Sequence, residues 1–285
     1  MVVLVTGSSG QLGQALQFIA PKHKEFQFVF CSSSELDITD RANCNAIFEQ
    51  YQPQYCINTA AYTAVDKAET ESEKAYSINV IGAGNIAEVC KKLNTVLIHI
   101  STDFVFDGTR KLPYTEEDQP NPTGVYGKTK LEGEVAVQQT WKKHYIVRTS
   151  WVYSPFGHNF MKTMLRLASE RETISVVNDQ IGTPTNAVDL AEALVQIIKN
   201  NQQQPAIDNY GIYNFSNEGQ CSWYDFAEKI FEINKISINL LSIPTSSFPT
   251  PAKRPSYSVL DKTKIKKAFS LKINNWETSL KDERK

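Results

Sequence analysis

The fold is decided by the stretch "VVLVTGSSGQLGQAL", residues 2–16. Residues 2–7 form an apolar run that predicts a buried strand, and residues 10–20 follow with the spacing of a helix. Valine- and isoleucine-rich runs then alternate with helical stretches through the first 150 residues. Such runs, separated by helices long enough to cross over, predict a parallel sheet covered on both faces. We therefore expect an α/β fold with a doubly wound parallel sheet.

The periodicity of the chain predicts the remaining elements in the same way. In the first half the expected strands are 26–31, 54–60, 95–102 and 145–153, and the expected helices are 40–51, 70–93 and 126–140. The second half is less regular, with expected helices at 160–170, 186–200 and 222–233 and strands at 173–179 and 211–217. The polar stretch 200–204 predicts a surface loop. The Pro/Ser-rich stretch 242–258 predicts a segment that wraps over the other elements.

The charge balance of the chain excludes several classes of partner. Thirty basic and 31 acidic residues leave a formal charge of −1 over 285 residues, so bulk electrostatics favours neither nucleic acid nor membrane. No apolar run is long enough to span a bilayer, and the amino terminus lacks the basic region of a signal peptide. We expect no nucleic-acid or membrane partner and a cytoplasmic location.

The five cysteines are scattered and form no C-x-x-C pair. An odd number without framework spacing favours reduced thiols over disulfides, as in a cytosolic protein. The four histidines are isolated from one another and from the cysteines. We therefore expect no metal site of the structural zinc type.

The glycines of the opening stretch predict a dinucleotide site. They follow a strand and begin a helix, where backbone amides and the helix dipole can hold a pyrophosphate. Gly7 permits the tight turn, Gly10 permits close approach of the ligand, and Gly13 permits close packing of helix on sheet. The spacing is G-x-x-G-x-x-G, the pattern of the extended short-chain dehydrogenase/reductases. The predicted contacts of this turn are Gly7, Gly10, Gln11, Leu12 and Gly13.

A second group of residues predicts proton transfer. Ser101, Thr102 and Asp103 end the expected strand 95–102, where their side chains would face the ligand cleft of a parallel sheet. Tyr126 precedes Lys130 by four residues, so the two share one face of a helix. A nearby ammonium stabilises phenolate, so we expect Lys130 to lower the Tyr126 pKa toward neutrality and make the phenol a general acid.

With these motifs in place, the chain resembles the dTDP-4-dehydrorhamnose reductases, a family of extended short-chain reductases. The resemblance runs along nearly the full length. Its more discriminating segments are "STDFVFDG" (101–108) and "DQIGTPT" (179–185), supported by "YGKTKLEGE" (126–134) and "RPSYSVLD" (254–261). It implies reduction of the C4 ketone of dTDP-4-dehydro-β-L-rhamnose to dTDP-β-L-rhamnose, with NADPH or NADH as coenzyme.

The resemblance also implies roles for individual residues. Tyr126 would protonate the developing alkoxide, Thr102 would hydrogen-bond the same oxygen, and Lys130 would hold the nicotinamide ribose. Further coenzyme contacts would come from Asp37, Ile38, Ala60, Ala61 and Thr63. Further substrate contacts would come from Asp103, Phe104, Trp151, Asn159, Lys162 and Arg254. For Trp151 a core position, for Asn159 a helix cap, and for Lys162 and Arg254 solvated charges are the alternatives.

The expected domains follow from the same resemblance. Residues 1–150, with a contribution from 180–215, would form a Rossmann-like NAD(P)-binding domain. Residues 151–179 and 216–285 would form a smaller, largely C-terminal α/β domain that binds the sugar nucleotide.

The coenzyme preference and the oligomeric state stay open. The end of the second expected strand offers Cys31 and serines, with Asp37 further on and no arginine for a 2′-phosphate, so NADH and NADPH are both compatible. Some relatives carry carboxylates that bind Mg²⁺ at a dimer interface, but Gln14 and Ala15 stand in the first helix here. Mg²⁺ is thus unsupported, and the chain is expected to be a monomer or a homodimer.

Two other functions remain possible on the sequence. One is a reductase or epimerase acting on a different nucleotide sugar, since the hydride and proton machinery is shared. The other is a catalytically silent, NADP-binding regulatory subunit. The presence of Thr102, Tyr126 and Lys130 argues against the second.

Overall fold

A six-stranded parallel sheet forms the centre of the computed structural model, which describes residues 1–204 and 209–282. The predicted spans 180–215 and 216–285 include 205–208 and 283–285, which lie outside the described residues. The strand order is β10-β5-β4-β3-β1-β2, with every neighbouring pair parallel. The strands are β1 (Val2–Thr6), β2 (Gln27–Cys31), β3 (Tyr55–Asn58), β4 (Val96–Thr102), β5 (His144–Thr149) and β10 (Gly211–Asn214).

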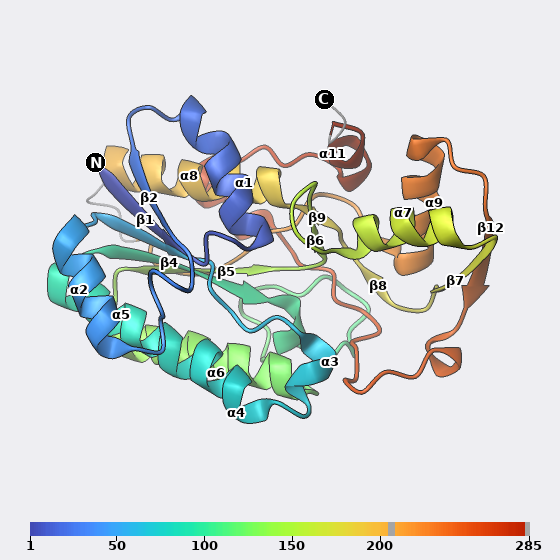
Figure 1. Cartoon of the computed structure of the whole chain (residues 1–285), viewed down its shortest axis with the longest axis horizontal. Helices are drawn as coiled ribbons and strands as arrows, with labels where there is room; N and C mark the ends of the chain where they lie inside the picture. Colours follow the sequence, from blue (N-terminus) through green and yellow to red (C-terminus); the bar gives the residue numbers. More distant parts are fainter. Residues whose placement is uncertain (205–208, 283–285) are drawn as a thin grey trace.

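Helices cover both faces of this sheet, as the predicted fold class requires (Figure 1). On one face lie α1 (Gln11–Ile19), α8 (Ala187–Gln203) and α10 (Thr263–Phe269), and on the other lie α2 (Arg41–Tyr51), α5 (Ala83–Leu93) and α6 (Val125–Thr140). Successive strand residues point to opposite faces. Val3 and Val5 accordingly pack with Leu194 of α8, while Leu4 packs with Phe48 of α2.

The strand order reverses beside β1, because β2 lies on one side of it and β3 on the other. In open α/β sheets ligands bind outside the carboxyl ends of the strands at such a point. The carboxyl ends point toward the middle of the molecule, where the chain passes into its second half (Figure 1). This edge is where the predicted site residues belong.

The second half forms its own small core around Tyr153, Phe226 and Trp276. Its short strands pair as β6 (Val152–Tyr153) with β9 (Thr185–Asn186), β7 (Thr173–Val177) with β12 (Asn239–Ile243), and β8 (Ile181–Gly182) with β11 (Cys221–Ser222). The helices are α7 (Phe160–Glu170), α9 (Trp223–Asn234) and α11 (Trp276–Asp282). The Pro/Ser-rich segment after β12 wraps back to the first half, as predicted (Figure 1).

Helix 70–93 was predicted as one regular helix, and this is wrong in detail. After the short α3 (Val65–Ala68), the chain forms α4 (Ser72–Tyr76), a π-helical turn η2 (Ser77–Gly82), and then α5. At the π turn the Asn79 side chain accepts from the Tyr62 N–H and donates to the Tyr62 carbonyl and to Thr129 Oγ1. These contacts connect the π turn to the segment after β3 and to α6.

Two other boundaries also differ from prediction. Strand 145–153 is broken after Thr149, because Trp151 adopts a left-handed backbone with φ +47°. Residues 200–203 continue α8 rather than forming a loop, since Asn201 is buried between two tyrosines. It accepts from Tyr55 Oη at 2.7 Å and donates to Tyr145 Oη at 3.0 Å. An asparagine that would be solvated in a loop is therefore held inside the fold.

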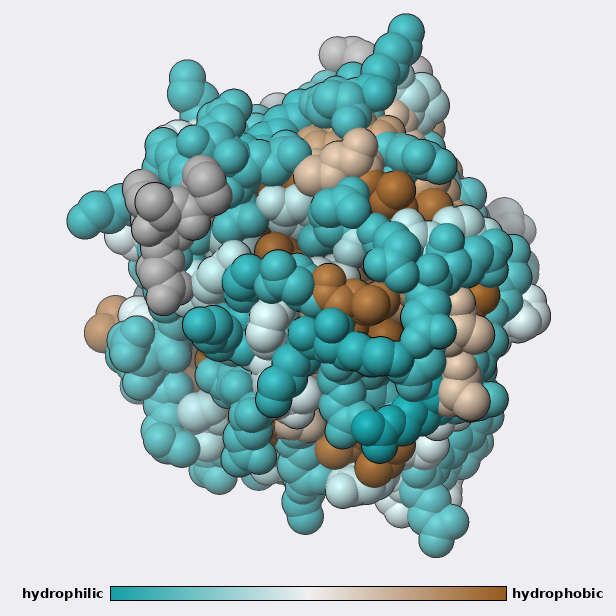
Figure 2. All heavy atoms as spheres, turned by 90° about the vertical axis from the view of Figure 1, so that its left-hand side faces the viewer, coloured by the Kyte–Doolittle hydropathy of each residue, from teal (hydrophilic) through white to brown (hydrophobic). Residues whose placement is uncertain are grey.

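The outer surface agrees with the balanced charge of the chain. On the face at the left of Figure 1, apolar residues form small areas separated by hydrophilic ones (Figure 2). Within residues 1–204 and 209–282, every helix falls short of the length and apolar character needed to cross a bilayer. All five cysteines are free and buried.

Candidate active site

The glycine turn between β1 and α1 leaves no room for side chains. Gly7 has φ +62°, and a Cβ there would lie 2.7 Å from the Ala60 nitrogen. A Cβ on Gly13 would lie 2.6 Å from the Gly7 carbonyl oxygen. The Gly10 N–H donates to that same carbonyl at 3.0 Å, and Gly10 begins α1 without a side-chain cap. The amino end of α1 is thus open to an anion, as the pyrophosphate prediction requires.

Gln11 and Leu12, the next two predicted contacts, differ in environment. Leu12 is buried in the core beneath the turn. The Oε1 of Gln11 accepts hydrogen bonds from Ser154 Oγ at 3.0 Å and from Asn159 Nδ2 at 2.9 Å. Gln11 therefore connects the glycine turn directly to the second half of the chain.

The residues predicted for the adenosine end lie near the same edge. Asp37 is exposed, and its Oδ1 accepts from the backbone and the hydroxyl of Thr39 at 2.9 and 2.8 Å. Ile38 is buried against Gly82. The other predicted residues of this group follow β3 directly and are partly or fully exposed; they are Ala60, Ala61 and Thr63.

Thr102 and Tyr126 are brought together at the carboxyl end of β4. Thr102 is the last residue of β4, and its hydroxyl lies near enough to the Tyr126 phenol to lower the pKa of that phenol. Thr102 Oγ1 also donates to Asp103 Oδ1 at 3.0 Å and accepts from the Phe104 N–H at 3.2 Å. The strand-end hydroxyl and the phenol thus share one small polar site.

Helix α6 is seated so that Tyr126 reaches this site. Gly127 lies against the Phe104 carbonyl, where any side chain would collide. The amino end of α6 has no cap of its own, and Glu69 supplies one by accepting the Val125 N–H at 2.9 Å. A carboxylate at this end also interacts favourably with the helix dipole. Glu69 was not predicted, because a capping contact across 56 residues leaves no local pattern.

The pKa values of the two helix residues differ from the expectation. Burial raises the pKa of Tyr126 to about 12, partly offset by the nearby Thr102 hydroxyl, which favours phenolate. Burial also lowers the pKa of Lys130 to about 8, partly offset by the nearby Glu134 carboxylate. The Lys130 ammonium donates to the Ile100 carbonyl at 2.7 Å. The prediction that Lys130 lowers the Tyr126 pKa is therefore wrong for the chain by itself, because desolvation dominates for both groups.

A buried ion pair lies behind Lys130. Arg148 on β5 holds Glu134 through two contacts, Nε to Oε1 at 2.9 Å and Nη2 to Oε2 at 2.7 Å. The Ser101 hydroxyl also donates to Glu134, at 2.5 Å, so the expectation that Ser101 faces the ligand cleft is wrong. Residues 126, 130 and 134 recur every four positions, and this spacing was the available sequence signal for Glu134.

Asp103 and Phe104 flank the hydroxyl pair. The Phe104 ring meets the Tyr126 ring edge-on, with centroids 5.5 Å apart. Asp103 is buried, which raises its pKa to about 6 against hydrogen bonding from Ser258 and Thr102. The Asp103 carboxylate also contributes to the raised pKa of the Tyr126 phenol.

The remaining predicted substrate residues have protein partners in the structure. Trp151 stacks on Trp223 with centroids 3.6 Å apart. Asn159 caps α7 by accepting the Lys162 N–H, and Lys162 Nζ donates to the Pro155 carbonyl. Arg254 forms a bidentate pair with Asp66, described below. Sequence reasoning did not single out Trp223 or Asp66.

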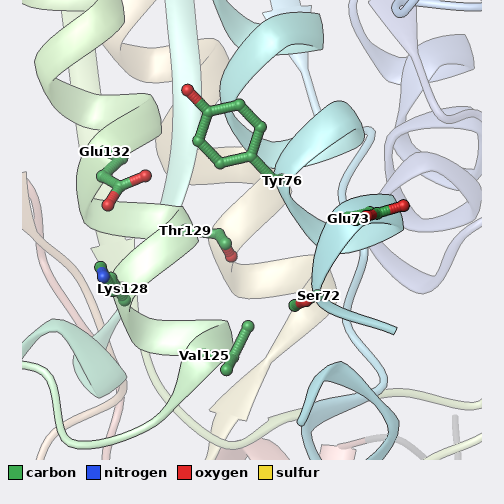
Figure 3. A pocket seen from close by; sticks show the side chains of 7 residues that line it. All are labelled: Ser72, Glu73, Tyr76, Val125, Lys128, Thr129 and Glu132. Atoms are coloured by element: carbon green, nitrogen blue, oxygen red, sulfur yellow. The ribbon is translucent and has the colours of Figure 1, made fainter. Parts of the chain in front are cut away.

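A surface pocket lies outside this constellation, between α4 and α6 (Figure 3). None of the predicted site residues lines it, and its lining is Ser72, Glu73, Tyr76, Val125, Lys128, Thr129 and Glu132. Over residues 1–204 and 209–282, no three or more of the His, Cys, Asp and Glu side chains gather as a metal site would require.

The doubly wound sheet, the glycine turn and the Tyr-x-x-x-Lys helix beside a strand-end threonine define a short-chain dehydrogenase/reductase. Comparison with known proteins narrows the class. The family model described as "RmlD substrate binding domain" matches residues 1–284. The chain belongs to this family, that of the dTDP-4-dehydrorhamnose reductases.

Individual relatives agree over nearly the whole length. The dTDP-4-dehydrorhamnose reductase of Aggregatibacter actinomycetemcomitans is 42% identical over 288 aligned positions, covering 99% of this chain and 98% of the relative. The crystal structure of a dTDP-4-dehydrorhamnose reductase from Clostridium acetobutylicum has a TM-score of 0.93 and 42% identity, covering 100% of this chain and 98% of its own. The Bacillus anthracis reductase in complex with NADP has a TM-score of 0.93 and 40% identity, covering 99% and 98%.

Proposed function

We propose that the protein reduces the C4 ketone of dTDP-4-dehydro-β-L-rhamnose to the alcohol of dTDP-β-L-rhamnose, with NADPH or NADH as the reductant. The observation that carries the proposal is the proximity of the Thr102 hydroxyl to the Tyr126 phenol, with the buried Lys130 one helical turn from Tyr126. Relatives named for this activity match over the full length. The reaction belongs to dTDP-L-rhamnose biosynthesis.

The glycine turn fits the coenzyme. The proposal is supported by the close packing of the backbone at Gly7 and Gly13, where a Cβ would collide with neighbouring backbone atoms. In this proposal Gly7, Gly10, Gln11, Leu12 and Gly13 form the pyrophosphate turn. The adenosine side is lined by Asp37, Ile38, Ala60, Ala61 and Thr63. When bound, the reduced nicotinamide supplies the hydride that C4 receives.

The protein's own part is proton delivery to the ketone oxygen. Tyr126 gives its phenolic proton to the oxygen that becomes the hydroxyl, and Thr102 hydrogen-bonds the same oxygen and holds it in place. A pKa of about 12 keeps the phenol protonated at neutral pH, the form that a proton donor needs. The Lys130 ammonium holds the nicotinamide ribose. Water then returns the proton to Tyr126.

Substrate binding is assigned to the second half and the edge that faces it. Asp103 and Phe104 flank the reacting centre, and Trp151, Asn159, Lys162 and Arg254 contact the sugar nucleotide. Residues 1–150 and 180–215 form the coenzyme domain, supported by the pairing of β10 with β5 in the main sheet. Residues 151–179 and 216–285 form the substrate domain, supported by the separate core around Phe226.

The setting of the reaction is part of the same proposal. The five free cysteines fit a reducing compartment, so we place the reaction in the cytoplasm. NADPH is supported as a coenzyme by the NADP complex of the Bacillus anthracis relative. The chain works as a monomer or as a homodimer without a bridging metal, and sedimentation velocity with and without Mg²⁺ decides between them.

A coupled assay tests the function. The purified protein is expected to oxidise NADPH or NADH only when the dTDP-4-keto-6-deoxy-L-sugar is supplied. Turnover with another nucleotide sugar but not with this one would reject the assignment in favour of the alternative reductase or epimerase. Binding of NADP(H) without any turnover would favour the regulatory subunit.

Tyr126→Phe tests the mechanism. The change removes only the phenolic oxygen, so we expect kcat to fall by about 100-fold or more while coenzyme affinity is retained. The matched control is Tyr76→Phe, on the exposed side of α4. A Tyr126→Phe variant with wild-type kcat would remove Tyr126 from proton transfer.

A further inference from the structure

One ion pair connects the wrapping segment to the edge of the main sheet. Arg254 lies in the Pro/Ser-rich segment after β12, and Asp66 lies in α3. Nη1 of Arg254 donates to Asp66 Oδ1 at 2.9 Å and Nη2 donates to Oδ2 at 2.8 Å. The carboxylate thus takes the end of the guanidinium in a bidentate contact. From β12 the wrapping segment descends and runs along the lower right of the view toward α3 (Figure 1).

The hydrogen bonds leave one side of the guanidinium available. Arginine has five N–H donors in a planar fork. Nη1 uses its two hydrogens on Asp66 and on the Ala252 carbonyl, and Nη2 uses one on Asp66. The Nε hydrogen and the second Nη2 hydrogen lie side by side, and no described residue accepts them. Two adjacent donors of this kind match two oxygens of a phosphate.

The pair also lies at the correct place for a substrate contact. α3 follows the segment 60–63 at the carboxyl end of β3, and the next residue after α3, Glu69, caps the helix that carries Tyr126. The wrapping segment is fixed on both sides of Arg254, by the burial of Ala252 and by the burial of Pro255 against Gly108. The position of the guanidinium is therefore set by contacts to the first half.

Stability alone does not explain so specific an arrangement. The Arg254 and Asp66 side chains are 25% and 39% exposed, and pairs of that exposure contribute little to folding. The hydrogen bonds from Arg254 lower the Asp66 pKa, so the carboxylate is charged at neutral pH. A charged carboxylate that fixes a partly exposed arginine restricts the directions in which the arginine can bind a ligand.

We propose that Asp66 is a positioning residue for substrate binding: it holds the end of the Arg254 guanidinium so that the Nε side is presented to the diphosphate of the nucleotide sugar. This inference rests on the proposed function, which supplies the diphosphate. Arg254 binds the anion directly, and Asp66 acts through Arg254. The neighbouring Ser256, which donates to the Gly108 carbonyl without touching the pair, has no part in it.

A double-mutant cycle on dTDP binding tests the proposal. Isothermal titration calorimetry is run with dTDP and with thymidine on the wild type, Asp66→Asn, Arg254→Gln and the double variant, with Ser256→Ala as control. Since hydrogen bonds to charged groups contribute about 1.5–3 kcal/mol, we expect Arg254→Gln to weaken dTDP binding about tenfold or more. Asp66→Asn should weaken it several-fold, and the double variant no more than Arg254→Gln alone.

Thymidine and the control separate positioning from folding. Thymidine lacks the diphosphate, so its affinity should stay unchanged in every variant, and Ser256→Ala should bind dTDP like the wild type. In turnover, Asp66→Asn should raise KM for the nucleotide sugar and leave kcat and KM for the coenzyme unchanged. Wild-type dTDP affinity in Asp66→Asn, a parallel loss of thymidine affinity, or additive losses in the double variant would each overturn the proposal.

Arg254→Lys provides a second, independent arm. Lysine keeps a positive charge for Asp66 but has no side-by-side donors, so dTDP binding should weaken about tenfold while the melting temperature is retained. A lysine variant that binds dTDP like the wild type would overturn the use of the Nε side. Because dTDP binding needs no turnover, the proposed reaction can fail in the coupled assay while this inference stands. Conversely, the coupled assay can succeed while the binding measurements overturn the role of Asp66.

Discussion

The buried pair of Glu134 and Arg148 gives the most exacting prediction. Glu134→Gln keeps the size of the side chain but removes its charge. It also replaces one carboxylate oxygen by an amide nitrogen, which cannot accept a hydrogen bond from Arg148. The side chains of Arg148 and Glu134 are 2% and 1% exposed, so water cannot compensate. Breaking such a pair costs about 3–5 kcal/mol because it leaves an uncompensated charge. At roughly 2–4 °C per kcal/mol, the melting temperature should fall by about 10 °C.

The assay is thermal unfolding followed by circular dichroism, with two reference variants. Glu132→Gln makes the same chemical change two residues earlier on α6, at the surface pocket, and should change stability by at most about 0.5 kcal/mol. Glu134→Leu with Arg148→Met removes both charges together. Replacing a buried pair by apolar side chains is often neutral, so this double variant should be more stable than Glu134→Gln.

Two results would refute the reasoning. One is a Glu134→Gln variant that melts within about 2 °C of Glu132→Gln, which corresponds to roughly 1 kcal/mol or less. The other is a double variant that is no more stable than Glu134→Gln, since removing both charges should leave neither uncompensated. Either result would mean that the buried Arg148 charge does not need the Glu134 carboxylate to balance it.

Two further predictions concern α6. Glu69→Ala removes the acceptor that caps the Val125 N–H, so it should lower the free energy of unfolding, measured with denaturant, by about 1 kcal/mol and should also lower kcat. Glu69→Gln keeps an acceptor and should lose less stability. Equal losses in the two variants would contradict the capping role. Lys130 has a pKa of about 8, and its charged form hydrogen-bonds the ribose more strongly than the neutral amine does. The kcat/KM for the coenzyme should therefore fall as pH rises above about 8, and Lys130→Arg should remove that inflection; an unchanged profile in the arginine variant would assign the inflection to another group.

Much of the fold could be predicted because its signals are local. The strands of the main sheet are continuous apolar runs, and the helices between them have apolar residues at helical spacing, so their existence and order follow from short windows. The glycine turn could be predicted for the same reason. Its strand, turn and helix lie within residues 2–19.

The errors have long-range causes. The π turn depends on Asn79 bonding to Tyr62, and the extension of α8 depends on Asn201 bonding to Tyr55 and Tyr145. In a short window of sequence each asparagine is only a polar residue, because the tyrosines to which it hydrogen-bonds lie outside the window. The break in strand 145–153 depends on Trp151, whose ring is held by Trp223 and Gly182.

The candidate site shows the same division. Thr102, Tyr126 and Lys130 could be named from spacing, because a strand end and one helical turn place them. Their pKa values could not be predicted, since burial by distant elements determines both. Asp66 lies in α3 and Glu69 follows that helix directly, and their roles depend on contacts 188 and 56 residues away. Such residues act only through a partner that is distant in the sequence, so the sequence around them does not reveal their role.

The amide of Gln11 has a consequence for recombining this enzyme with its relatives. Gln11 belongs to the glycine turn of the first half, yet it accepts hydrogen bonds from Ser154 and Asn159 of the second. If the second half were exchanged for that of a relative, Gln11 Oε1 would face the relative's side chains at positions 154 and 159, which need not donate to it. A chimaera cut near residue 150 should therefore carry positions 11, 154 and 159 from a single parent. The two halves should therefore be exchanged together, and the boundary near residue 150 is a poor crossover point for a chimaera.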